Sequence, residues 1–172
     1  MKKLLAVIDM QNDFIDGALG TKEAVALVPA VAARIRAFDG DVVYTQDTHG
    51  ADYLNTNEGR RLPVPHCIKG TPGWAIRGEV LAAGAGKTVA CIEKNYFGTP
   101  ELPALIERNG YESVELIGLC TDICVISNAF GIRSVLPEFP VSIRAHCCAG
   151  VTPESHANAL NAMRACMIDI LE

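Results

Sequence analysis

The sequence alternates short apolar runs with longer segments of helical spacing, and this alternation constrains the fold more than any other feature. β-Branched and aromatic residues fill runs such as 41–47 (DVVYTQD), as they do in strands. Apolar residues in 24–40 recur at the spacing of one helix face. The runs that we expect to form strands are 4–9, 41–47, 88–94, 113–119, 141–145 and 167–171. The segments that we expect to form helices are 24–40, 74–83, 100–110, 122–136 and 152–166.

Strands that alternate with helices build a parallel sheet that is covered on both faces. Right-handed crossovers between six such strands predict a doubly wound, Rossmann-like α/β fold, a three-layer sandwich around a mainly parallel sheet. The 172 residues suffice for one domain with a sizeable core, and no repeat or linker divides them. We therefore expect a single α/β domain over 1–172.

Charge and hydropathy exclude two classes of partner. The formal net charge is -5, whereas binding to nucleic acids or anionic membranes needs a basic face. No stretch approaches the roughly 18 apolar residues of a membrane span, and the first apolar run stops at Asp9. We expect a cytoplasmic protein with no nucleic-acid or membrane partner. Its seven cysteines, an odd number spread through apolar runs, argue against a disulfide framework.

Reactive side chains follow the ends of the predicted strands. Asp9, Asp47 and Lys94 end the first three strands. Cys124 follows the fourth strand, and the polar segment 48–73 begins after the second. Ligands bind outside the carboxyl ends of the strands in an open parallel sheet, and long loops inside compact domains usually carry function. We therefore expect these groups to converge at one edge of the sheet.

Cys124 has two interpretations, a packed helix cysteine or a nucleophile. Thr121 or Asp122 is suited to cap the following helix, so that Cys124 would lie in its first turn. There the helix dipole and a nearby Lys94 ammonium would lower the pKa of the thiol. Asp9 is either a structural hydrogen-bonding carboxylate or the proton carrier for this thiol. Lys94 is otherwise a solvated strand end.

Four candidate metal ligands lie in and just before the polar segment. The spacing of Asp47 and His49 puts both side chains on one side of an extended strand. Carboxylates together with imidazoles suit zinc first, with manganese and iron as alternatives. The competing interpretation is a group of solvated surface side chains, because the spacing matches no fixed motif. The candidate ligands are Asp47, His49, Glu58 and His66.

Two further features are expected to carry no chemistry. The sequence GKT at 86–88 resembles the end of a phosphate-binding loop, but that motif needs a glycine where Leu81 stands. It also needs a strand before it and a helix after it, and the predicted order is the reverse. His146 and His156 have no reactive neighbours in the sequence. We expect His146 to be a strand-end residue and His156 to be a helix-surface residue.

Three segments together resemble the isochorismatase-like cysteine hydrolases, and among these the nicotinamidase and pyrazinamidase amidohydrolases. They are LLAVIDMQNDF, CIEKNYFG and GLCTDICV, and the resemblance covers essentially the whole chain. It implies that Asp9, Lys94 and Cys124 are catalytic. It also implies a cis peptide bond between Leu119 and Cys120. The backbone N–H groups of Cys120 and Cys124 would then form an oxyanion hole, and the Cys120 sulfur would only pack.

The resemblance also bears on the metal, the substrate and the assembly. It implies metal binding by Asp47, His49 and His66, with Glu58 as an added ligand, and it implies a homo-oligomer. After His49 the chain reads HGADYLNTNEG, which differs from the run found in many nicotinamidases and leaves the substrate open. Aromatic residues near the motifs are candidates for a wall against a flat ring, with core packing as the alternative. These residues are Phe14, Trp74, Tyr96 and Phe97.

The expected reaction is hydrolysis of a small carboxamide through a cysteine thioester, with nicotinamide giving nicotinate and ammonia. The presence of Cys124 argues against a true isochorismatase, since those enzymes lack the nucleophile. The alternative within the family is an amidase or ureido-hydrolase with another small amide as substrate. Outside it, the alternatives are a metal- or ligand-binding protein that has kept only the fold, and a redox role for Cys120 and Cys124.

Overall fold

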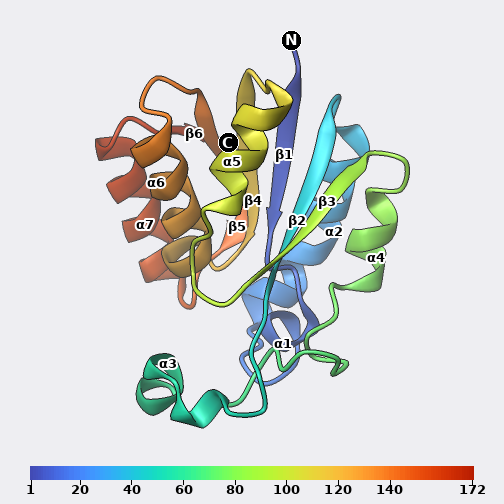
Figure 1. Cartoon of the computed structure of the whole chain (residues 1–172), viewed down its shortest axis with the longest axis vertical. Helices are drawn as coiled ribbons and strands as arrows, with labels where there is room; N and C mark the ends of the chain where they lie inside the picture. The colour runs from blue at the N-terminus through green and yellow to red at the C-terminus, as the bar shows by residue number, and fades with distance from the viewer.

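An entirely parallel sheet of six strands forms the middle layer of the computed structural model, which describes residues Met1–Glu172 (Figure 1). The strand order is β3-β2-β1-β4-β5-β6, and every neighbouring pair is parallel. This order reverses direction beside β1, which confirms the predicted doubly wound fold. The strands are β1 (Lys3–Ile8), β2 (Asp41–Asp47), β3 (Thr88–Lys94), β4 (Ser113–Leu119), β5 (Val141–Ala149) and β6 (Asp169–Leu171).

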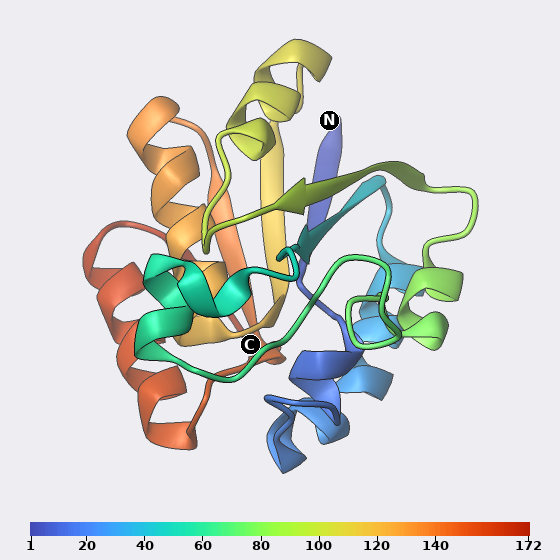
Figure 2. The same ribbon diagram turned by 60° about the horizontal axis from the view of Figure 1, so that its bottom comes forward.

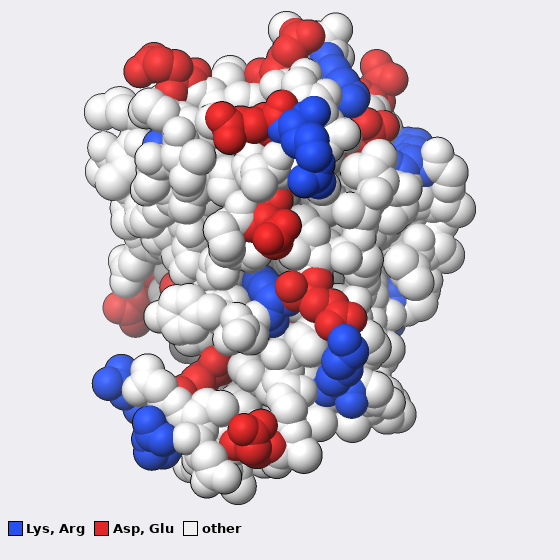
Figure 3. Space-filling view, viewed as in Figure 1, with Lys and Arg blue, Asp and Glu red and all other residues white.

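Helices cover both faces of the sheet (Figure 1). On one face lie α2 (Lys22–Ala37) and α4 (Gly78–Ala83). On the other lie α5 (Glu101–Asn109), α6 (Ile126–Val135) and α7 (Pro153–Ala165). None of these helices combines the length and the apolar character that crossing a lipid bilayer requires. Acidic and basic side chains are interspersed over the face of the molecule in Figure 3, with no extended basic patch.

The central strand β1 shows why the sequence needs helices on both sides. Its side chains are buried from Leu4 to Ile8. Leu5 and Val7 pack in the core under α2, whereas Leu4, Ala6 and Ile8 pack in the core under α5 and α6. Successive side chains of a strand point to opposite faces, so a continuous apolar run fits a strand that is buried on both faces.

Local capping sets the ends of the helices on either side of the sheet. The Thr21 side chain accepts from the Ala24 N–H at the start of α2. At the start of α7, the N-cap Thr152 and Ser155 form a reciprocal capping box. Prediction failed at 74–77, which is not helical. There the Trp74 carbonyl accepts hydrogen bonds from the Gln11 and Gln46 side-chain amides.

Three other parts of the chain differ from prediction. Strand β5 continues to Ala149, because an irregularity in its pairing with β4 restores the ladder at Gly118 and Cys148. The segment 48–73 is not structureless: it contains a 3₁₀ turn (Tyr53–Asn55) and α3 (Asn57–Arg61). A short helix α1 (Asn12–Ile15), which was not predicted, follows β1. Figure 2 brings the carboxyl edge of the sheet forward and shows the segment 48–73 crossing it.

Gly118 allows β4 to approach β1 closely at the carboxyl edge. Its φ is +117°, and a Cβ atom there would collide with the carbonyl oxygen of Ile8. A side chain at this position would therefore be strained and would push the strands apart. The residues after Gly118 and those after Ile8 are thereby held together.

A buried ion cluster links α2 to the sheet away from this edge. The Glu115 carboxylate accepts two hydrogen bonds from Arg34 at 2.7 Å each. It accepts two more from Arg144, at 2.8 and 3.1 Å. Burial by itself would raise the pKa of Glu115, but the hydrogen bonds from Arg34 and Arg144 outweigh it and lower this pKa.

We expect Glu115→Gln to lower the free energy of unfolding by about 2 kcal/mol at neutral pH, because it leaves two arginines without their carboxylate. The folded-state pKa lies below the usual value of about 4.3, so the contribution is complete above about pH 5 and disappears as the pH falls through the folded pKa. Urea unfolding at both ends of this range measures it. The exposed Glu112 supplies the control, Glu112→Gln. An equal loss of stability at acidic pH would contradict this account.

Candidate active site

Three residues from separate segments meet at the carboxyl edge of the sheet. Asp9 follows β1, Lys94 ends β3, and Cys124 lies in the turn after β4. The Lys94 Nζ lies 2.6 Å from Asp9 Oδ2 and 3.7 Å from Cys124 Sγ. All three residues are buried. The structure therefore brings together the three residues that the sequence motifs singled out.

The backbone and a threonine fix the Asp9 carboxylate. Asp9 has a φ of +44°, an uncommon value for a residue other than glycine. The Thr45 hydroxyl donates to Asp9 Oδ1 at 2.6 Å and accepts from the Asp9 N–H at 3.2 Å. Sequence reasoning missed Thr45, because its only signal was a polar residue inside β2. These contacts leave Oδ2 facing Lys94.

Burial sets the direction of the pKa shift for two of the three residues, Asp9 and Cys124. It raises the pKa of Asp9 against the opposing effect of Lys94. It raises the pKa of the Cys124 thiol as well, and the Asp9 carboxylate raises it further. The pKa of Lys94 is raised, because Asp9 and Cys124 outweigh burial. The thiol therefore keeps its proton at rest, and its reaction requires a base.

This result corrects the expectation that the helix start would lower the Cys124 pKa. The residues Thr121–Val125 form a π-helical turn that leads into α6, and Cys124 is 5% exposed. At that burial, the loss of hydration outweighs the attraction of a helix terminus. The Leu119–Cys120 bond is cis, as the resemblance implied. The half-buried Cys120 side chain packs against the core and also lines the cavity beside Cys124.

Two hydrogen bonds tie the nucleophile turn to α7 and to the loop before it. Thr121 Oγ1 lies 2.8 Å from His156 Nδ1, and Asp122 Oδ1 accepts from the Val151 N–H at 3.1 Å. Burial lowers the pKa of His156, so the ring is neutral, and its tautomer sets which of the two groups donates. His156 is thus half-buried and bonded rather than a surface residue. The exposed His146 lies within β5 rather than at its end, because β5 is longer than predicted.

A second cluster joins the four predicted metal ligands beside these residues. The His49 Nε2 lies 2.9 Å from Asp47 Oδ2 and 3.8 Å from Glu58 Oε1. The His66 Nε2 lies 3.5 Å from each of the same oxygens. One ligand atom from every residue lies within 4.8 Å of the others. Asp47 Oδ1 lies 3.5 Å from Lys94 Nζ, so the two clusters are neighbours.

The arrangement of these side chains fits a divalent cation. His66 Nδ1 lies 2.8 Å from the Val64 carbonyl, which only accepts, so the lone pair of Nε2 faces the cluster. The buried Asp47 Oδ1 has no hydrogen-bond partner. Burial and the Asp47 carboxylate raise the pKa of Glu58, as expected for acids that share one site. Two imidazole nitrogens and two carboxylates are ligands that zinc accepts.

Gln11 holds the metal-binding strand in register with β1. Its side-chain amide donates to the Asp47 carbonyl at 2.8 Å and accepts from the Asp47 N–H at 2.7 Å. Sequence reasoning missed Gln11, although it lies in the quoted motif. Asp13 accepts from the Cys67 N–H at 2.8 Å and so ties the loop before Cys67 to α1.

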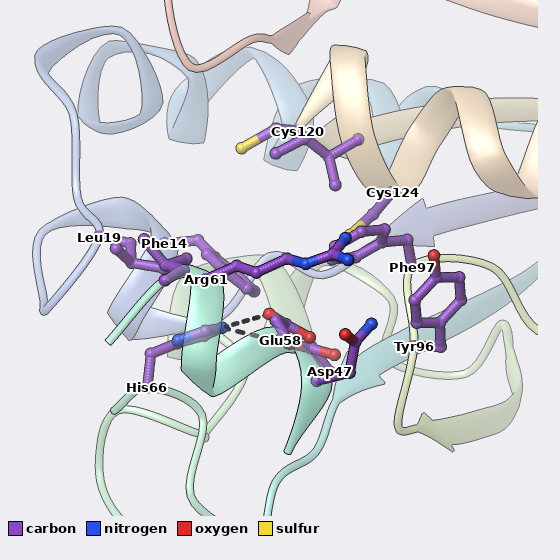
Figure 4. Close-up of a pocket in the computed structure, with 13 residues that line it drawn as sticks. Phe14, Leu19, Asp47, Glu58, Arg61, His66, Tyr96, Phe97, Cys120 and Cys124 are labelled. Carbon is purple, nitrogen blue, oxygen red and sulfur yellow. Dashed lines mark ion pairs between the residues drawn. The ribbon is translucent and has the colours of Figure 1, made fainter. Parts of the chain in front are cut away.

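A cavity of about 230 Å³ opens onto both clusters (Figure 4). Phe14, Tyr96 and Phe97 line it, and the rings of Tyr96 and Phe97 stack with their centroids 4.6 Å apart. Trp74 was expected there and is not among the lining residues. Its indole N–H donates to Thr48 Oγ1 at 2.9 Å instead.

A doubly wound sheet that buries a cysteine, a lysine and an aspartate together is typical of α/β cysteine hydrolases. The model of the isochorismatase domain matches residues 3–172, and the chain belongs to this family. Every helix and strand of the structure lies within the matched residues.

Several relatives share the whole fold. The nicotinamidase/pyrazinamidase of Mycobacterium tuberculosis is 28% identical over 187 residues, covering 98% of each chain. The crystal structure of nicotinamidase from Bacillus subtilis matches with a TM-score of 0.85 at 28% identity, covering 100% of both chains. Pyrazinamidase of Pyrococcus horikoshii, in complex with zinc, matches with a TM-score of 0.78 at 26% identity. That match covers 100% of this chain and 99% of the other.

We expect the purified protein to retain about one divalent ion per chain, because four side chains converge on one point. His66→Ala removes one ligand and should lose the ion on dialysis, whereas His146→Ala, at an exposed histidine of β5, should retain it. Elemental analysis of the dialysed proteins measures the difference. Equal metal content in both variants would contradict the assignment.

Proposed function

We propose that this chain hydrolyses small carboxamides through a thioester on Cys124, with nicotinamide giving nicotinate and ammonia. The observation that carries the proposal is the contact of Lys94 Nζ with both Asp9 Oδ2, at 2.6 Å, and Cys124 Sγ, at 3.7 Å. A nucleophile, a carboxylate base and a buried cation therefore share one charge network beside a cavity. The names of the M. tuberculosis and B. subtilis relatives support nicotinamide as substrate.

In the acylation step, the Asp9 carboxylate takes the proton of the Cys124 thiol as sulfur attacks the amide carbon. The carbonyl electron pair moves to oxygen, where the N–H groups of Cys120 and Cys124 stabilise it. The C–N bond then breaks, and Asp9 passes its proton to the departing ammonia. Lys94 keeps both the carboxylate and the transient thiolate in their charged forms.

In the deacylation step, Asp9 takes a proton from water, and the hydroxide attacks the thioester carbon. The C–S bond breaks, the thiolate regains its proton, and the carboxylic acid leaves. The raised pKa of Asp9 suits both directions of transfer, because a carboxyl group that binds a proton more readily is a better base.

Asp47, His49, Glu58 and His66 would hold a divalent ion, with zinc as our proposal. Zinc in complex with the P. horikoshii pyrazinamidase and the donor set described above support this choice. When bound, the ion supplies a Lewis acid for a ring nitrogen or for water. We further propose a homo-oligomer, by family resemblance, and a cytoplasmic location, by charge and hydropathy.

Replacing the nucleophile tests the reaction. We expect Cys124→Ala to lower kcat for nicotinamide by more than about 1,000-fold, because no thioester forms. Cys166→Ala, at an exposed cysteine of the α7 terminus, should keep the wild-type rate. Ammonia release measures both rates, and circular dichroism checks the fold. Full activity of Cys124→Ala would refute the mechanism.

The Thr121–His156 hydrogen bond should affect turnover by holding the nucleophile turn. We expect His156→Phe to lower kcat about tenfold, because small displacements of a nucleophile reduce its rate of attack. His156→Gln keeps an acceptor and should recover most of the loss. Thr121→Val should lower kcat by the same factor as His156→Phe. The double variant should lower kcat no further than either single variant. Additive losses of kcat would show that the bond plays no such role.

A further inference from the structure

The helix α3 presents one face to the cavity. Asn57, Glu58, Arg61 and Leu62 all line it. This spacing is that of one side of a helix. Arg60 lies outside this set, and its guanidinium donates to the Asn55 carbonyl at 2.5 Å. In Figure 4 the Arg61 side chain extends over the cavity rather than away from it.

The position of α3 is fixed by packing. Thr56 caps the helix by accepting from the Gly59 N–H at 2.9 Å. Gly59 is buried, and a Cβ atom there would collide with the Tyr53 carbonyl, so only glycine permits this approach. Tyr53 in turn lies against His49 and His66, with ring centroids 4.8 and 5.0 Å away. Arg61 is therefore carried by a helix that is anchored on the metal-ligand cluster.

Arg61 is the one cation of the cavity wall that has no anionic partner. Glu58 is the acid nearest to it on the helix, but its carboxylate faces His49 and His66, at 3.8 and 3.5 Å. Asp9 is paired with Lys94. No ion pair of the structure involves Arg61.

The rest of the wall is chiefly apolar. Phe14, Phe97 and Ile123 supply surfaces for a flat or aliphatic substrate body. Arg61 is exposed to solvent, so a charged group can reach it without being buried unpaired. An unpaired guanidinium over an apolar slot matches a planar anion, which it can bind with two parallel hydrogen bonds.

We propose that Arg61 binds a carboxylate on the substrate, so that the preferred substrates are small amides carrying a second, ionised carboxyl group. This inference rests on the proposed amide hydrolysis. The amide carbon has to meet the buried Cys124, whereas Arg61 is exposed on α3. The carboxylate is a group separate from the scissile amide, and it takes no part in the bond changes of hydrolysis. Asn57, one helical turn before Arg61, lies on the same side and offers a further N–H donor.

Matched pairs of amides test the proposal. One pair is nicotinamide and 5-carbamoylpyridine-3-carboxylate, which differ only in the carboxylate. The other is pentanamide and 4-carbamoylbutanoate, a flexible pair of equal chain length. We expect wild-type kcat/KM to favour the charged member of at least one pair by about tenfold or more, mainly through KM. The preference should weaken as salt is added.

Two variants locate the effect. Arg61→Met should abolish the preference for the charged amide, and Arg61→Lys should keep part of it. Arg60→Met removes the same charge from the same helix, but from outside the cavity, and should preserve both the preference and the rate. The preference is a ratio within one protein, so a general loss of activity or stability in a variant does not alter its meaning.

The possible outcomes separate this inference from the reaction on which it rests. Hydrolysis that depends on Cys124 but shows no carboxylate preference in either pair overturns the role of Arg61 alone. A preference that survives in Arg61→Met, or disappears equally in Arg60→Met, also overturns it. Failure to hydrolyse any of the four amides refutes the proposed function itself.

Discussion

The buried ammonium of Lys94 is the interaction on which the site depends. It lies 2.6 Å from Asp9, 3.7 Å from Cys124 Sγ and 3.5 Å from Asp47 Oδ1. A buried cation without such partners would cost several kcal/mol. The ends of β1, β2 and β3 and the turn after β4 must therefore assemble around it. The fold achieves this because the carboxyl ends of parallel strands meet at one edge.

The same ammonium makes the nucleophile and the metal-ligand cluster one electrostatic unit. Asp9, Asp47 and Glu58 contribute three carboxylates to the two side-chain clusters, and Lys94 is the one lysine or arginine that pairs with them. A divalent cation among Asp47 and Glu58 would balance the remainder. Burial and the neighbouring Asp47 raise the pKa values of Glu58 and Asp9, because both oppose ionisation. A divalent cation bound by this cluster would therefore bear on the base as well as on the substrate.

Sequence reasoning succeeded where local pattern and topology determine the result. β-Branched runs gave β2, β3 and β4 with their observed bounds, and parallel topology then brought Asp9, Lys94 and Cys124 together. Sequence reasoning failed where contacts between residues far apart in the sequence determine the surroundings of a side chain.

These failures share a physical origin. His156 looked like a surface residue because its partner Thr121 lies 35 residues away. Trp74 was assigned to the cavity because nothing in the sequence reports its hydrogen bond to Thr48. The raised pKa of Cys124 follows from its burial, which only the packed structure shows.

The sheet and the segment 48–73 have different roles: the sheet positions the reacting groups, and the segment forms part of the substrate wall. Strand ends hold Asp9 and Lys94 at spacings that the sheet enforces, so the chemistry has little freedom to vary. The helix α3, by contrast, is joined to the sheet by loops and anchored through Tyr53 and Gly59. Substitutions on its cavity face change the substrate wall without moving the strands. Departure from the usual nicotinamidase pattern just after His49 therefore bears on substrate choice and leaves the reacting groups in place.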